Sequence, residues 1–140
     1  MKKLWILSLL LTFSFAQAQT AGGVQFSDGW IKQLPPVIPM RAGYVVIKNT
    51  GATPKTITSL SSAAFDKVEI HETKMADGVM KMIELNQLVI PPGGQVELKP
   101  GGKHMMLIAP KQTMQIGDTI ELQVNFADGA QQTISLQVKK

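Results

Sequence analysis

Short β-rich runs separated by glycine and proline turns are the feature that most limits what this chain can fold into. After residue 20, no segment shows the apolar stripe of an amphipathic helix, whereas runs rich in β-branched and aromatic residues recur, each ending at a turn signal. The predicted strands cover residues 43–49, 68–71, 79–85, 88–90, 96–98, 104–109, 119–126 and 132–138. Residues 127–129 are expected to form a hairpin turn. This pattern predicts an all-β, single-domain sandwich or Greek-key barrel.

Two connecting segments do not fit a strand. Residues 33–39 hold three prolines, which a central strand cannot accommodate, so we expect an extended loop between the first two strands. Residues 61–64 are a candidate for one helical turn. We find no internal repeat and no low-complexity linker.

The first eighteen residues are typical of a cleaved secretory signal. Lys2 and Lys3 precede an apolar run over residues 4–15, and Ala16-Gln17-Ala18 is a small-x-small cleavage site. The run is too short to span a bilayer. We therefore predict a signal peptide at residues 1–18 and a soluble, exported, periplasmic domain at residues 19–140. With no cysteine at the cleavage point, a lipoprotein anchor is not expected.

Charge gives no indication of a nucleic-acid partner. Without Lys2 and Lys3 the chain has 12 basic and 10 acidic side chains, a net charge of +2, and its lysines are dispersed among acidic residues. Nucleic-acid binding needs clustered basic charge on one face. We expect a monomer with no nucleic-acid partner.

Histidine and methionine carry the only strong chemical signal. The chain has no cysteine, and its two histidines, His71 and His104, lie among methionines. Residues two apart in a strand share a face, so His104 and Met106 should project together while Met105 points the other way. Two neighbouring strands would then bring His71, Met82, His104 and Met106 to one point. Imidazole and thioether are soft ligands that suit Cu(I), and the missing thiolate excludes a blue-copper electron-transfer site.

The remaining methionines have weaker assignments. We place Met75 in a loop over residues 73–78 and treat it, with Met80, as a candidate auxiliary donor. Met105 is expected in the core, where methionine commonly fills gaps. Met40 and Met114 receive no role.

The spacing H-x10-M-x21-H-x-M resembles that of the periplasmic copper chaperone family called PCuAC. Residues 43–49 (GYVVIKN), 77–82 (DGVMKM), 100–107 (PGGKHMML), 117–118 and 126–129 also match motifs of that family. The resemblance implies a cupredoxin-like β-sandwich that binds Cu(I) through His71, Met82, His104 and Met106. It also implies delivery to copper-accepting proteins, such as a cytochrome c oxidase subunit or a Sco-like thiol protein. Met105, where an aliphatic residue is expected, and the lack of a His/Met-rich tail depart from the pattern.

Other functions fit the sequence less well. There is no G-x-S-x-G elbow, and residues 101–103 lack the glycine spacing and Ser or Thr of a phosphate loop, so we predict no enzymatic activity. Copper storage or detoxification remains an alternative to delivery. A non-metal adhesion or carbohydrate-binding sandwich would explain the fold and the export but not the methionines.

Overall fold

The computed structural model describes residues 23–140, so the predicted signal peptide lies outside the described residues. Their regular structure consists of ten strands, which confirms the all-β prediction. The strands are β1 (Val24–Lys32), β2 (Met40–Asn49), β3 (Lys55–Ser61), β4 (Phe65–Ala76), β5 (Val79–Leu85), β6 (Leu88–Ile90), β7 (Gln95–Leu98), β8 (Lys103–Pro110), β9 (Thr119–Phe126) and β10 (Gln131–Lys139). Within residues 23–140, no helix could cross a membrane.

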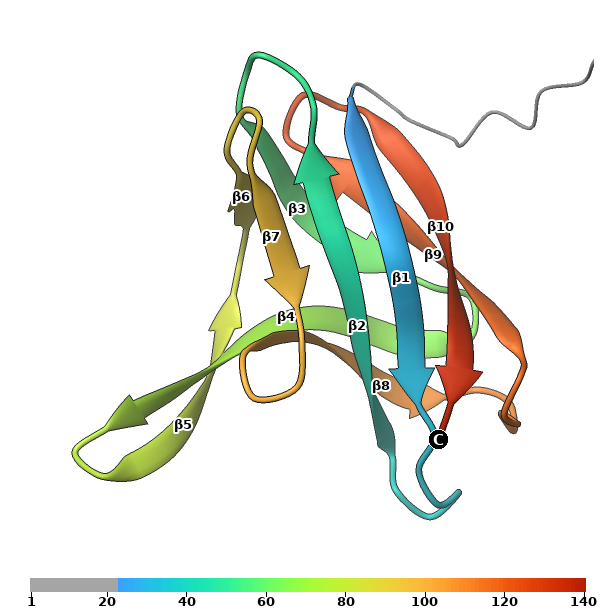
Figure 1. The fold of residues 1–140 in the computed structure, drawn as a ribbon. Coiled ribbons are helices and arrows are strands. Elements are labelled where there is room, and N and C mark those ends of the chain that lie inside the picture. The colour runs from blue at the N-terminus through green and yellow to red at the C-terminus, as the bar shows by residue number, and fades with distance from the viewer. Residues whose placement is uncertain (1–22) are drawn as a thin grey trace, which may run out of the picture.

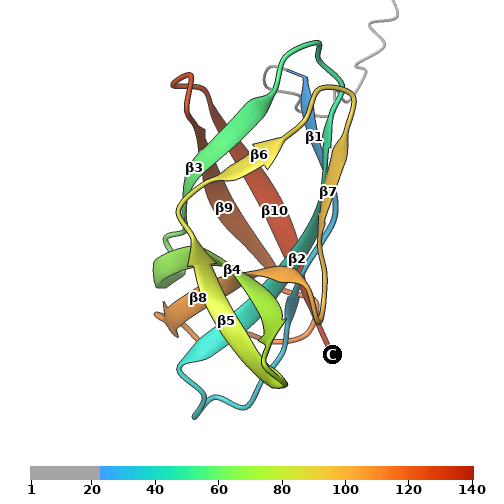
Figure 2. The same cartoon turned by 90° about the vertical axis from the view of Figure 1, so that its left-hand side faces the viewer.

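Seven of the strands close into a barrel. Neighbours follow the order β4-β8-β2-β1-β10-β9-β3, and β3 returns to β4 through the pair Leu60–Val68. The β1–β10 pair is parallel and the other pairs are antiparallel. Strands β5, β6 and β7 extend the sheet beside β4, β3 and β2 (Figures 1 and 2).

The core follows the two-residue period of the strands. Every second residue of β9 and β10 is buried, from Ile120 to Val138, and the same alternation buries Ile70 and Met105 on β4 and β8. Apolar burial of this kind is the main stabilising contribution to folding, about 25 cal/mol per Å² removed from water. Gly43 on β2 lies opposite Met105, and a Cβ there would come within 3.1 Å of the Met105 methyl carbon. The missing side chain makes room for the methionine where an aliphatic residue was expected.

Most of the predicted strands and turns are present, with three corrections. Residues 33–39 form the predicted loop, and 127–129 the predicted turn. Strand β3 was not predicted, because its polar TITS run has few large apolar residues. The candidate helical turn at 61–64 is instead the end of β3 and a tight turn, in which Phe65 N donates to the Ser62 carbonyl at 3.4 Å. The predicted loop at 73–78 is also wrong, since β4 continues to Ala76.

Strands β4 and β5 form a hairpin that projects beyond the barrel (Figure 1). Its turn is Asp77-Gly78, with φ of 52° and 77°. Two positive φ values are the signature of a type I′ turn, for which Asp-Gly is a preferred pair. The tight turn lets β4 run on without a loop and fixes the register of β5 against it.

Candidate metal centre

His71 and His104 face each other across two neighbouring strands. They are directly opposed in the β4–β8 register, and their ring centroids lie 5.9 Å apart at 39°. Their chain neighbours Ile70 and Met105 are also opposed and point into the core. Because side chains alternate along a strand, both imidazoles lie on the outer face of the barrel.

Both predicted methionine ligands share this outer face. Met106 follows His104 by two residues on β8 and is paired with Glu69 of β4. Met82 on β5 is paired with Thr73, which follows His71 by two residues. The four predicted ligands therefore come from three adjacent strands, β5, β4 and β8, rather than from two. Neighbouring strands are about 4.8 Å apart, within the reach of long side chains.

The four side chains differ in their exposure to solvent. His104 is 9% exposed, whereas Met82 is 54% exposed. The His71 side chain is 13% exposed. The imidazoles are thus largely buried against the sheet, while Met82 lies exposed on the projecting hairpin.

Each imidazole has one nitrogen engaged by the protein. Nδ1 of His104 lies 3.1 Å from the Gly102 carbonyl, which can only accept, so this nitrogen donates. Nε2 of His71 lies 2.6 Å from Oε2 of Glu69, and donates to that carboxylate. These bonds fix the tautomers and leave Nε2 of His104 and Nδ1 of His71 with a lone pair. Nδ1 of His71 is buried and has no hydrogen-bond partner among residues 23–140, which is costly unless another ligand takes it.

Glu69 is a site residue that the sequence analysis missed. Its other oxygen, Oε1, lies 2.6 Å from Nζ of Lys67. Hydrogen bonds from Lys67 and then from His71 hold the pKa of the Glu69 carboxyl below its usual range, so the group stays ionised and accepts from the imidazole. The same two-residue rule that paired His104 with Met106 could have found Glu69 beside His71.

A hollow of about 410 Å³ lies beside the His104 imidazole. It is lined by Ala42, Tyr44, Thr73, Met80, Lys81, Met82, Gly101 and His104. Tyr44 forms one wall and packs against Trp30 with ring centroids 4.7 Å apart, and burial raises the pKa of its phenol. The hollow gives solvent access to His104 from the side of the hairpin methionines.

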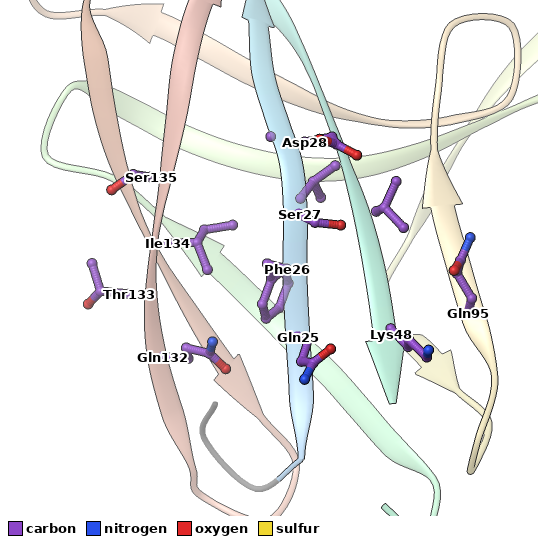
Figure 3. Close-up of a pocket in the computed structure, with 13 residues that line it drawn as sticks. Gln25, Phe26, Ser27, Asp28, Lys48, Gln95, Gln132, Thr133, Ile134 and Ser135 are labelled. Atoms are coloured by element: carbon purple, nitrogen blue, oxygen red, sulfur yellow. The ribbon is translucent and has the colours of Figure 1, made fainter. Parts of the chain in front are cut away.

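A larger hollow, of about 530 Å³, is separate from this site. It lies along β1 and β10, with Phe26, Asp28 and Gln132 on its walls, and it has no histidine or methionine (Figure 3). Asp28 has a φ of 54° and lies in a bulge of β1 between Ser27 and Trp30. Pairing between β1 and β10 begins only after this bulge, at Trp30, and the hollow lies before it. This hollow offers no soft ligand.

The other methionines divide clearly between surface and core. Met75 and Met80 are directly opposed on the hairpin and are 67% and 65% exposed. Met105 is 1% exposed, as predicted, and Met114 is also buried. Among residues 23–140, no group of three or more His, Cys, Asp or Glu side chains could hold a metal ion, so histidine and methionine together make the candidate site.

Residues 24–138 match the family described as "Putative lipoprotein LpqE-like". A "Putative lipoprotein" of Leifsonia xyli subsp. xyli is 33% identical over 129 residues, covering 89% of this chain and 76% of that protein. An uncharacterized protein of Rickettsia prowazekii is 31% identical over 98 residues, covering 69% of this chain and 54% of its own length.

Solved structures of PCuAC domains have the same fold. The copper-bound PCuAC domain from PmoF2 superposes with a TM-score of 0.74 at 20% identity, covering 86% of this chain and 96% of that domain. The solution structure of CuI-DR1885 from Deinococcus radiodurans has a TM-score of 0.63 at 24% identity, covering 89% and 82%. These likenesses confirm the predicted cupredoxin-like fold. The chain belongs to the LpqE-like family, which is the PCuAC-type family.

Proposed function

We propose that this protein is a periplasmic Cu(I) chaperone that carries one copper ion between His71, Met82, His104 and Met106. The observation that carries the proposal is the opposed pair of imidazoles, each with one nitrogen fixed by the protein and one left with a lone pair. Copper-bound structures of the PmoF2 domain and of DR1885 support the choice of metal.

The ligand chemistry suits an ion that must be both held and released. Thioether and imidazole favour Cu(I), a d¹⁰ ion without a strong geometric preference. Methionine releases no proton on binding, unlike a thiol, which must be deprotonated. We infer that the buried His104 anchors the ion and that the exposed Met82 is the ligand that an acceptor reaches first. No catalytic step is required, and we propose no enzymatic activity.

Export and delivery belong to the same proposal. Residues 1–18 have the pattern of a secretory signal. The family and the Leifsonia xyli relative, both described as putative lipoproteins, support a location in the cell envelope. The proposed partners are copper-accepting proteins, among them a cytochrome c oxidase subunit or a Sco-like protein, and the proposed carrier is a monomer with domain limits at 19–140.

An anaerobic transfer assay tests this function. The purified protein should bind one tightly held Cu(I), and after removal of free copper it should pass the ion to an apo copper-accepting domain of an oxidase subunit. Transfer is followed by separating the two proteins and measuring copper in each. Copper that stays on this protein would favour storage or detoxification instead. Absence of bound copper would favour a non-metal β-sandwich.

A further inference from the structure

The tip of the β4–β5 hairpin carries an unusual concentration of exposed thioethers. Met75, Met80 and Met82 are 67%, 65% and 54% exposed, and β5 is an edge strand with every residue but Leu85 exposed. An exposed apolar edge strand favours aggregation, and natural proteins normally limit it. Three methionines at such an edge therefore point to a function.

The strand register brings these thioethers together on one face. Met75 is directly opposite Met80, and Met82 is opposite Thr73, two residues before Met75. Opposed Cβ atoms in an antiparallel pair are about 4.5–5.5 Å apart, and flexible methionine side chains can converge from that distance. All three side chains lie on the same face as His71, because residues two apart in a strand point the same way.

A hollow joins two of these methionines to the His104 imidazole. The hollow of about 410 Å³ has His104 on one wall and both Met80 and Met82 on others. Met82 thus lines the hollow together with His104, and it shares one face of the hairpin with Met75 and Met80. An ion held near His104 therefore has the thioethers of Met82 and Met80 close by, around the same hollow.

We propose that Met75, Met80 and Met82 form a second, weaker Cu(I) site through which the ion leaves the His/Met site. Met82 is shared: it stays bound while the bonds from copper to His71, His104 and Met106 break and bonds to Met80 and Met75 form. Copper remains Cu(I) throughout, and no electron or proton is transferred. This inference rests on the proposed function and adds the direction of exit.

Methionine-methyl NMR of the full chain tests the second site. Anaerobic titration with Cu(I) should first move the methyl signals of Met82 and Met106, and a second equivalent should move those of Met75 and Met80. In the M75L/M80L double variant the first equivalent should bind as before, while affinity for the second should fall by about tenfold or more, which corresponds to about 1.4 kcal/mol. Both side chains are exposed, so folding should be unaffected.

Met40→Leu is the matched control, because Met40 is 40% exposed at the start of β2, outside the hairpin. It should leave both equivalents unchanged. Methyl signals of Met75 and Met80 that do not move at two equivalents, or a double variant that still takes up the second ion, would overturn the second site alone. A chain that binds no Cu(I) would overturn the proposed function and this site together.

Discussion

The chemistry at the residue scale depends on which nitrogen of each histidine the protein leaves available. A backbone carbonyl fixes His104 through Nδ1, and a carboxylate fixes His71 through Nε2. The nitrogen left with a lone pair therefore differs between the two rings: Nδ1 in His71 and Nε2 in His104. A ligand that takes both lone pairs also removes the cost of the unpartnered, buried Nδ1 of His71.

Replacing His104 by alanine should remove most of the Cu(I) affinity, because the chain loses the ligand that is held most firmly by its surroundings. Met105→Leu, one residue away on the opposite face, should change affinity little. It should also cost less than about 1.5 kcal/mol of folding stability, since the volume is nearly conserved. Competition against a Cu(I) chelator measures both variants. Equal losses would contradict the assignment of faces.

Glu69→Ala should weaken Cu(I) binding by about ten- to a hundredfold, the usual effect of removing a carboxylate that orients a ligating histidine. Glu72→Ala is the control. Its carboxylate faces away from the imidazoles and pairs with Lys74 and Lys103 at 3.5 and 3.4 Å, so affinity should stay near that of the unchanged protein. Competition against a Cu(I) chelator measures the affinity of the Glu69 and Glu72 variants, and histidine NMR reports the environment of His71 in each. An unchanged His71 environment in the Glu69 variant would count against the orienting role.

At the scale of elements, two short hairpin turns determine the registers on which the sheet depends. Asp77-Gly78 closes β4 onto β5, and the turn after β9 closes it onto β10. In the second turn Asp128 accepts from the Ala130 amide at 2.9 Å and pairs with Lys55 of β3 at 2.8 Å. One carboxylate thus ties three strands together.

The Asp128 interaction predicts a pH-dependent stability. The hydrogen bond from Lys55, then that from Ala130, lowers the pKa of the Asp128 carboxyl in the folded protein. A lowered folded pKa means that the stabilisation is complete above the unfolded carboxyl pKa and is lost as pH falls through the folded one. Asp128→Asn should therefore be less stable than the unchanged chain at neutral pH, with the difference shrinking in acid.

Chemical denaturation at neutral and acidic pH measures this difference. Lys55→Met should also lose stability at neutral pH and less in acid, as Asp128→Asn does. It removes the hydrogen-bond partner that lowers the pKa of the Asp128 carboxyl most. A difference between the unchanged chain and Asp128→Asn that is equal at both pH values would refute the interaction.

For the molecule as a whole, local patterns predicted the all-β class but not the three-dimensional pairing of the strands. The ligand set that they suggested remains a prediction. Glycine and proline turns separated the strands, and the two-residue period assigned His104, Met105 and Met106 to their faces. The pairing of His71 with His104 depends on a barrel whose strands are far apart in the sequence. No local signal gives that register.

The errors have the same origin. Strand β4 continues past its predicted end at His71 because Thr73, Lys74 and Met75 pair with β5 across the tight turn. Strand β3 is polar and was missed, although its pairing with β9 and β4 closes the barrel. In both cases, hydrogen bonding to a partner strand decided the structure: the adjacent β5 for the end of β4, and the distant β9 for β3.

The decisive experiment is copper K-edge X-ray absorption of the full chain loaded with one equivalent of Cu(I). We expect two imidazole nitrogens and two thioether sulfurs around the ion, with the sulfur contribution lost in the M82L/M106L double variant. A spectrum with nitrogen or oxygen ligands alone, or one that the double variant leaves unchanged, would contradict this ligand set.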